Sequence, residues 1–266
     1  MGINFLHNYN PEPIAFSIGF LDIYWYGIII ALVVIVGLLL ITKFAKKRNI
    51  DVNHIYNLLF ILLISSLIGG RIGHIIGEWD YYVENLNELV KIWHGGLAIQ
   101  GIMIMDLLVV YIYGRIKKIN FLAFTDLIVI ALPLMQSIGR WGNYFNQELF
   151  GLPTSVTWGL PIETNRRPLE YINENFFHPV FLYESILMLG VFFVMLWLFN
   201  NKKHWPVGKL TLMYFIMFSV VRFSLDFIKV DLLTVGPLLL TQWISILLFI
   251  GTIFFIYINF KKNNSV

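Results

Sequence analysis

The sequence contains no cysteine and few charged residues. The absence of cysteine excludes a disulfide framework, a thiolate metal site and a cysteine nucleophile. Only 13% of the 266 residues are charged, about half the share of an ordinary soluble domain. With 58% hydrophobic and 17% aromatic residues, the composition excludes a disordered chain and is typical of a membrane protein. The net charge of +3 is too small to indicate nucleic-acid binding.

Long apolar segments are abundant, and a spanning helix needs about 20 such residues. We therefore predict an all-α, polytopic membrane protein with a single transmembrane domain over residues 1–266. The expected spans are residues 25–44, 55–76, 97–113, 124–138, 181–199, 210–227 and 238–260. The polar connection 140–179 is long enough to form a small external subdomain between the fourth and fifth spans.

Basic residues predict the orientation of the chain. Twelve of the 19 lysines and arginines follow the first, third, fifth and seventh spans, whereas the other connections are acidic. We expect the N-terminus outside and the C-terminus in the cytoplasm. The first twenty residues lack the basic region of a cleavable signal peptide, and residues 14–20 are candidates to lie along the membrane surface. The lack of internal repeats disfavours a transporter, and the lack of HExxH or GxSxG motifs disfavours an intramembrane protease.

Three arginines are expected within or at the end of spans, namely Arg71, Arg140 and Arg222. A cation in hydrocarbon costs at least about 2.5–3.5 kcal/mol, so each needs a partner. In one interpretation Arg71 or Arg222 pairs with a carboxylate of Glu184, Asp106 or Asp226. In the other the guanidinium binds a phosphate, whose oxygens match its forked donors. Arg140 and Arg222 are both expected toward the outer half of the membrane, which favours one shared anionic ligand.

Small and polar residues in the second span have simpler explanations. Gly69, Gly73 and Gly77 recur every four residues, which predicts close helix packing. His74 and Glu78 share a helix face, but two residues do not make a metal site. We predict no metal site in this chain.

Three polar runs stand at the outer ends of different spans. They are GRWGNYFNQE at 139–148, HGGLAIQG at 94–101 and HPVFLYE at 178–184. Their glycines permit close approach of a ligand to the backbone. Because all three runs are expected on the outer side of the membrane, they favour one shared site at the outer leaflet.

These runs resemble those of the prolipoprotein diacylglyceryl transferase family, and the likeness extends from Tyr26 to VRFSLD at 221–226 and Gln242. The resemblance implies transfer of the diacylglyceryl group of phosphatidylglycerol to the lipobox cysteine of a prolipoprotein signal peptide, with release of glycerol phosphate. It implies a multi-pass protein of the bacterial plasma (inner) membrane whose partners are these substrates and membrane lipids. It implies no metal, no organic cofactor and no nucleic acid.

The resemblance also implies roles for particular residues. The expected catalytic residues are Arg140, Arg222, Glu148, His94 and Tyr26. The expected substrate-binding residues are Arg140, Gly142, Asn143, Asn146, Gln100 and Asp226. A free thiol has a pKa of about 8.5, so little thiolate is present at neutral pH and the substrate thiol must lose its proton to react. Guanidinium groups can stabilise the phosphate as it leaves.

The chain departs from the family at several positions. Gln100 stands where the family has histidine, and glutamine is no general base, so His94 and Glu148 are the alternative proton acceptors. Asp226 replaces a glutamate, and Lys229 replaces an arginine and loses its bidentate fork. Asp106 lies where the family is apolar. These departures leave open a divergent paralogue that binds membrane lipid without catalysis or with altered specificity.

Overall fold

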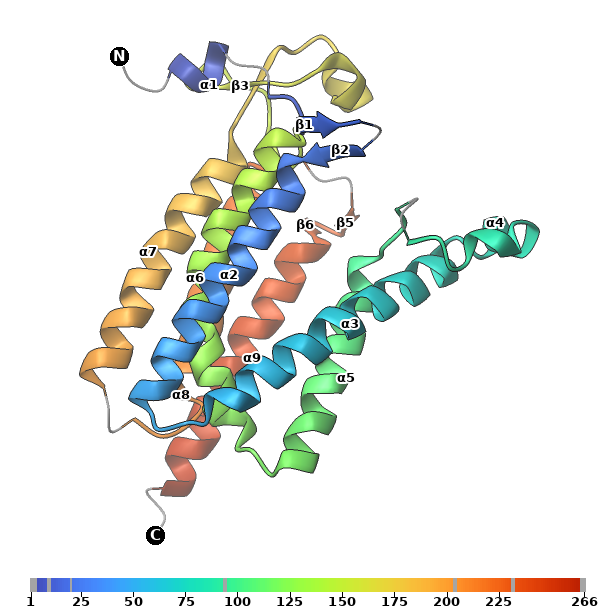
Figure 1. Ribbon diagram of the computed structural model, residues 1–266. Coiled ribbons are helices and arrows are strands. Elements are labelled where there is room, and N and C mark those ends of the chain that lie inside the picture. The colour runs from blue at the N-terminus through green and yellow to red at the C-terminus, as the bar shows by residue number, and fades with distance from the viewer. Residues whose placement is uncertain are drawn as a thin grey trace. The chain divides into compact units, whose positions relative to one another are not determined.

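The computed structural model describes residues 4–8, 11–19, 21–92, 95–202, 205–230 and 233–263. It is predominantly helical and divides into two compact units (Figure 1). Unit 1 comprises Met1–Leu40 and Thr125–Val266, and unit 2 comprises Ile41–Phe124. Helices α2 (Trp25–Lys47) and α6 (Phe121–Phe145) each run from one unit into the other.

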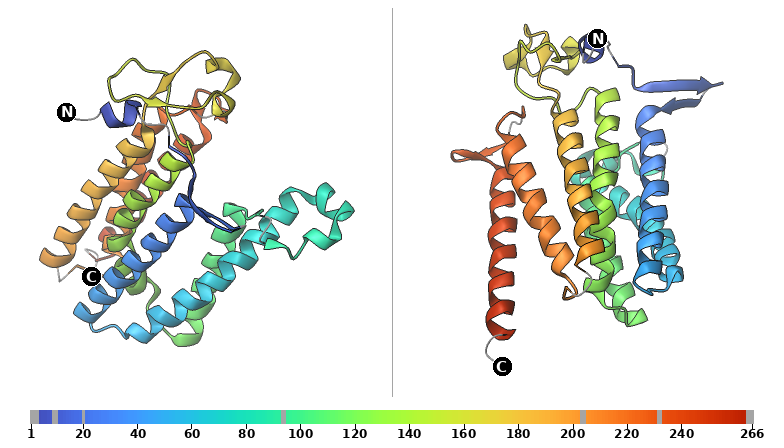
Figure 2. Two further views of the ribbon diagram at one scale, coloured as in Figure 1. Left: turned by 45° about the horizontal axis from the view of Figure 1, so that its top comes forward. Right: turned by 90° about the vertical axis from the view of Figure 1, so that its left-hand side faces the viewer.

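Helix α6 is the centre of unit 1. Its Met135 packs on Gly37 of α2, where an added Cβ would lie 2.6 Å from the sulfur. Its Ser137 hydroxyl lies 3.1 Å from the Ser185 hydroxyl of α7 (Val180–Asn201). Helix α8 (Lys209–Asp226) contacts α7 and α9 (Leu240–Asn263). Figure 2 shows these helices side by side.

A carboxylate on α6 holds the first turn of α8. Asp126 Oδ2 accepts a hydrogen bond from the backbone N–H of Gly208 at 2.7 Å. Its Oδ1 accepts from the backbone N–H of Thr211 at 2.8 Å and from the Thr211 hydroxyl at 2.7 Å. Donors at a helix start lack intrahelical partners, so Asp126 caps α8 from a neighbouring helix.

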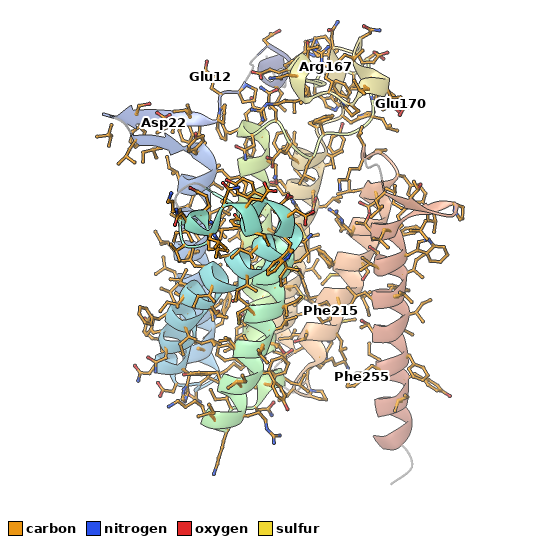
Figure 3. The ribbon with its side chains drawn as sticks, turned by 90° about the vertical axis from the view of Figure 1, so that its right-hand side faces the viewer. Glu12, Asp22, Arg167, Glu170, Phe215 and Phe255 are labelled. Carbon is orange, nitrogen blue, oxygen red and sulfur yellow. The ribbon has the colours of Figure 1, made fainter. Side chains whose placement is uncertain are left out.

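Short antiparallel strand pairs gather at one end of unit 1, here called the strand-bearing end. They are β1 (Ile14–Ile18) with β2 (Leu21–Tyr24), β3 (Leu160–Pro161) with β4 (Phe176–Phe177), and β5 (Thr234–Val235) with β6 (Leu238–Leu239). Helix α1 (Asn4–Asn8) and the 3-10 turns η3 (Thr164–Arg166) and η4 (Leu169–Tyr171) lie there too. Figure 3 labels Glu12, Asp22, Arg167 and Glu170 at this end, whereas Phe215 and Phe255 lie far along the helices.

The polar connection after α6 has its own hydrophobic core. The buried side chains of this core are Leu6, Tyr144, Leu160, Ile162, Phe177 and Phe181. Two of them belong to α6 and α7, so the connection is anchored on the helix ends. Residues 14–18, which the sequence made candidates to lie along the membrane surface, pair with residues 21–24 as a β-hairpin, so short strands accompany the helices of this predominantly α-helical chain.

Unit 2 is built on the close packing of α3 (Val52–Gly77) and α5 (Ile99–Lys117), with α4 (Trp79–Glu84) and η1 (Leu86–Glu88) between them in sequence. A Cβ at Gly73 would lie 2.8 Å from the Cα of Gly101, and Gly69 abuts the Gly101 carbonyl oxygen. Close packing is therefore confirmed at Gly69 and Gly73. At Gly77 it is wrong for the described part of the chain, where an added Cβ meets nothing within 4 Å.

Arg71 pairs with none of the three carboxylates considered from the sequence. Its guanidinium donates to backbone carbonyls: Nε to Leu89 at 2.9 Å, Nη1 to Gly95 at 2.7 Å, and Nη2 to Glu88. The ring of Tyr82 lies 5.1 Å from Arg71 Cζ. Arg71, which is buried, thus holds the loop that enters α5, and its donors are occupied by protein.

Asp106 also has a local explanation. Its carboxylate accepts hydrogen bonds from the hydroxyls of Ser65 at 2.6 Å and Ser66 at 2.7 Å, both on α3. The suggestion that Asp106 neutralises a buried arginine is wrong for Arg71, and serine donors satisfy it instead.

Among the residues that the structure describes, five helices are long and apolar enough to cross a membrane: Trp25–Lys47, Val52–Gly77, Phe121–Phe145, Val180–Asn201 and Leu240–Ile258. Helix α6 continues to Phe145, seven residues beyond the predicted end of the fourth span at residue 138. Arg140 therefore lies within a helix, and the polar connection starts six residues later than expected.

Candidate functional site

Two arginines from different helices meet on one buried glutamate. Glu184 of α7 is only 2% exposed. Its Oε1 lies 2.6 Å from Arg140 Nη2 of α6, and its Oε2 lies 3.5 Å from Arg222 Nη1 of α8. Arg222 Nε lies a further 3.5 Å from Oδ1 of Asp226, one turn along α8. Each of these charged groups has an oppositely charged neighbour, and removing one partner of a buried pair leaves an uncompensated charge.

The polar run at the end of α6 extends this network. Arg140 Nη1 donates to Asn143 Oδ1 at 3.4 Å. Asn143 Nδ2 donates to Glu148 Oε2, and Asn146 Nδ2 donates to Glu148 Oε1, each at 3.3 Å. Two amides thus hold both oxygens of one carboxylate, and a continuous chain of contacts links Glu148 to the guanidinium of Arg140.

The first turn of α2 packs against the same part of α6. A Cβ at Gly142 would lie 2.7 Å from Cδ2 of Tyr26, so only glycine allows this ring to approach. The ring of Trp25 stacks on Phe145 at a centroid distance of 4.9 Å. The absent side chain at Gly142 therefore fixes where Tyr26 lies relative to Arg140 and Asn143.

The backbone beyond α6 adopts an unusual conformation. Gln147 and Leu149 have φ of 52° and 55°, a region that costs a non-glycine residue free energy. The buried Gln147 amide supports it, because Nε2 donates to the Pro11 carbonyl at 3.1 Å and Oε1 accepts from the Glu163 N–H at 2.8 Å. These contacts hold the turn that brings Glu148 back toward Asn143.

Gly151 closes the same turn in a crowded position. A Cβ there would lie 2.8 Å from Val180 Cγ2 and 2.9 Å from His178 Cβ, and closer still to the Ile228 carbonyl oxygen. Residues 151, 178 and 228 are also joined by backbone hydrogen bonds, from Gly151 N–H to the His178 carbonyl and from Leu152 N–H to the Ile228 carbonyl, both 2.8 Å. The position thus joins the segments that follow α6, precede α7 and follow α8.

One donor of the site lacks a hydrogen-bond partner among the residues that the structure describes. Arg140 Nε is buried and makes no hydrogen bond among the described residues. Asp226 is 2% exposed, its Oδ1 lies 3.5 Å from Arg222 Nε, and neither of its oxygens makes a hydrogen bond within the part of the chain that the structure describes. A buried unsatisfied donor is rare and needs an explanation, and a charged N–H in a polar site suits an anionic oxygen.

Comparison with known sequences identifies the family. The family model described as prolipoprotein diacylglyceryl transferase matches residues 13–258. The chain belongs to this family.

Similar curated proteins include three named phosphatidylglycerol–prolipoprotein diacylglyceryl transferase. That of Thermosynechococcus vestitus is 36% identical and covers 86% of either chain. That of Finegoldia magna is 37% identical over 94% of this chain and 96% of its own. That of Clostridioides difficile is 37% identical over 96% of this chain and 98% of its own.

As a prolipoprotein diacylglyceryl transferase family member with several spanning helices, the chain is a multi-pass protein of the bacterial inner membrane. Most residues expected from the sequence to form the site lie together in unit 1. They are Tyr26, Arg140, Gly142, Asn143, Asn146, Glu148, Arg222 and Asp226. Gln100 is exposed on α5 in unit 2, and His94 lies outside the described residues.

From the sequence, Glu184 was considered only as one possible partner of Arg71 or Arg222. In the structure it is the residue on which Arg140 and Arg222 converge. Its position in the HPVFLYE run, at the start of a span, is the signal that identifies it. Gly151 was not singled out, although it follows the GRWGNYFNQE run by only three residues.

Proposed function

We propose that this chain transfers the diacylglyceryl group of phosphatidylglycerol to the lipobox cysteine of prolipoproteins and releases glycerol phosphate. The observation that carries the proposal is the buried, unpartnered Nε of Arg140 beside a second arginine on the same glutamate. This arrangement leaves a charged donor for a lipid phosphate while Glu184 fixes the orientation of the guanidinium.

The reaction needs this electrostatic arrangement. The thiolate sulfur attacks the glycerol carbon that carries the phosphate, the sulfur–carbon bond forms and the carbon–oxygen bond breaks. Negative charge then develops on the departing glycerol phosphate. Arg140, with Arg222 behind it, stabilises that charge in a site shielded from water, where such stabilisation is strongest.

The thiol proton needs an acceptor, and we propose Glu148 or His94. The amides of Asn143 and Asn146 orient the Glu148 carboxylate. If Glu148 is the base, a Glu148→Gln variant should lose the acidic limb of the pH–rate profile. If His94 is the base, a His94→Gln variant should lose that limb instead. A Gln100→His variant supplies the histidine usual in the family and should raise the rate.

The remaining site residues are proposed to line the lipid site or to position its charged groups. Tyr26 and Gly142 would form the wall beside the phosphate, and Asn143 and Asn146 would orient Glu148. Asp226 would hold Arg222 in place. Gln100 would contact substrate from α5.

One reconstitution tests the proposal. Purified protein is incorporated into phosphatidylglycerol vesicles with a lipobox peptide, and released glycerol phosphate is measured beside a homologue of known activity. We expect release by the wild type and near-complete loss in Arg140→Ala. Arg115→Ala, which removes an exposed cation at the end of α5, is the matched control and should retain the rate. Equal release by Arg140→Ala and wild type, or none by wild type, would contradict the proposal.

We further propose seven spans, an external N-terminus, a cytoplasmic C-terminus, and a single transferase domain with an external subdomain over residues 140–179. Helices α5 and α8 would supply the two spans beyond the five apolar ones. The chain has no cysteine, so single cysteines can be introduced and labelled without background. Impermeant maleimide should label intact cells at Ser17→Cys and Glu170→Cys, and should label Lys117→Cys only after lysis.

A further inference from the structure

A polar pair joins α6 and α8 beside the arginine site. The Tyr214 hydroxyl of α8 donates to Gln136 Oε1 of α6 at 3.1 Å. Tyr214 is only 3% exposed, and Glu184 and Arg140 are close enough for their charges to act on its hydroxyl. The Tyr214–Gln136 pair therefore borders the cluster in which Glu184 holds the arginines.

Gln136 and Arg140 share one face of α6. Residues four apart are neighbours along a helix surface, and four residues rise about 6 Å. Helix α6 runs toward the strand-bearing end (Figure 1), so Gln136 lies one turn further from that end, within the apolar length of the span. A ligand that is bound at Arg140 and extends along α6 toward the middle of the span meets Gln136 next.

The contact with Tyr214 fixes which end of the Gln136 amide is free. The Tyr214 hydrogen bond occupies Oε1, so Nε2 points away from the tyrosine oxygen. Among the described residues Nε2 makes no hydrogen bond, and it is not sealed in the protein, because the Gln136 side chain is half-buried and Nε2 is accessible. An amide N–H within a membrane span has no bulk water to bind, so leaving it unpaired is costly. Gln136 thus presents a donor that needs an acceptor from a ligand.

The ester groups of a glycerolipid are acceptors of this kind. An ester carbonyl accepts hydrogen bonds and has none to donate. In phosphatidylglycerol, five bonds separate the phosphorus from the carbonyl carbon of the acyl chain on the middle glycerol carbon. Three consecutive bonds of an extended chain span 3.8 Å, so five span about 6 Å. This distance equals the rise from Gln136 to Arg140.

We infer that Gln136 Nε2 binds the ester carbonyl on the middle glycerol carbon of the phosphatidylglycerol donor, and that Tyr214 positions the Gln136 amide for this contact. This inference rests on the proposed function. The lipid is then held at two points, its phosphate at Arg140 and its ester at Gln136. The carbon–oxygen bond that breaks lies between these points, so the carbon is presented to the thiolate in one orientation.

The test removes the carbonyl from the lipid and the amide from the protein. The donors are dipalmitoyl phosphatidylglycerol and its dihexadecyl ether analogue, which keeps the phosphate and the chain length but has no carbonyl. The double variant Gln136→Leu with Tyr214→Phe removes both partners, so no buried hydroxyl is left unpaired. Glycerol phosphate release in mixed micelles gives kcat/KM for each donor.

The preference for the diester over the diether is the quantity compared. We expect this preference to fall by about two- to tenfold in the double variant, which is the net effect of one hydrogen bond. The fall should come from slower turnover of the diester, with the diether rate nearly unchanged. Dividing the wild-type ratio by the variant ratio cancels any intrinsic difference in reactivity between the two lipids. Retained turnover of the diether shows that the variant folds with its arginines in place.

Two controls separate binding from structure. Ser137→Ala with Ser185→Ala removes a buried hydroxyl pair between α6 and α7 beside the same site, and should keep the wild-type preference. Tyr214→Phe alone keeps the amide but releases its orientation, so it should lose part of the preference. Lipids with one ester and one ether locate the contact: the one whose ester is on the middle carbon should behave as the diester.

Other outcomes overturn the inference. An unchanged preference in the double variant, or equal losses with both donors, would refute the ester contact and leave the Tyr214–Gln136 pair a purely structural one. Release from both lipids by the wild type with this result would leave the proposed function standing. Absence of release by the wild type with either lipid would contradict the proposed function itself. A preference that follows the ester on the terminal carbon would overturn the assignment to the middle one.

Discussion

The shared glutamate predicts a large energetic coupling between Glu184 and Arg140. Glu184 is buried and its Oε1 lies 2.6 Å from Arg140 Nη2, so removing either charge leaves the other buried and undercompensated. Breaking such a pair costs about 3–5 kcal/mol. Arg222 remains near Glu184 at 3.5 Å, so we expect about 2–4 kcal/mol for Arg140→Met or Glu184→Gln alone. The double variant should cost about 1–3 kcal/mol less than the sum.

The coupling is measured by thermal unfolding in detergent. For a chain of this size, 1 kcal/mol shifts Tm by roughly 2–4 °C, so each single variant should lower Tm by several degrees. The Lys91–Glu88 pair is the matched control: its atoms are 2.7 Å apart, but its side chains are 33% and 22% exposed. Lys91→Met with Glu88→Gln should give a coupling below about 1 kcal/mol. A coupling at Glu184–Arg140 no larger than at this control would refute the argument from burial.

Three further predictions follow from single positions. Gly151→Ala should nearly abolish activity and lower stability by about 1–3 kcal/mol, because a Cβ meets Val180 and His178. Gly190→Ala on α7, where a Cβ meets nothing within 4 Å, should leave both unchanged, and equal effects would contradict the reasoning. Asp106→Leu should lower the stability of the protein by about 1–3 kcal/mol, because Ser65 and Ser66 lose their acceptor. When both serines are also replaced with alanine, most of this loss should be recovered, as measured by Tm. Arg71→Lys should speed amide hydrogen exchange at residues 95–98, since one ammonium cannot reach all the carbonyls that the guanidinium reaches, and unchanged exchange would disprove the clamp.

The apolar helices were predictable because hydropathy reports them directly. The end of α6 was not, since Arg140, Asn143 and Asn146 read as a polar loop in sequence. Arg140 and Asn143 remain helical, and Asn146 lies in the turn just beyond α6, because the protein supplies their partners: Glu184 for Arg140, and Glu148 for the two amides. A hydropathy pattern records the cost of a polar residue and contains no information on a partner 44 residues away.

The partners of the arginines were likewise predictable only in part. Sequence reasoning correctly paired Arg222 with acidic residues, because carboxylates can be named from the sequence. It failed for Arg71, whose acceptors are backbone carbonyls 17 to 25 positions later. Every residue has a carbonyl, so no residue type marks these acceptors, and only the folded loop brings them together. Gly151 is similar, since its crowding arises from segments before α7 and after α8.

The capping of α8 by Asp126 bears on whether the peptide link between α7 and α8 is needed for assembly. The first turn of α8 is fixed by three hydrogen bonds to α6. The peptide link to α7 is therefore not what defines where α8 begins. A polypeptide divided between α7 and α8 and produced as two pieces should still reassemble in the bilayer, with the carboxylate acting as the recognition point between the fragments.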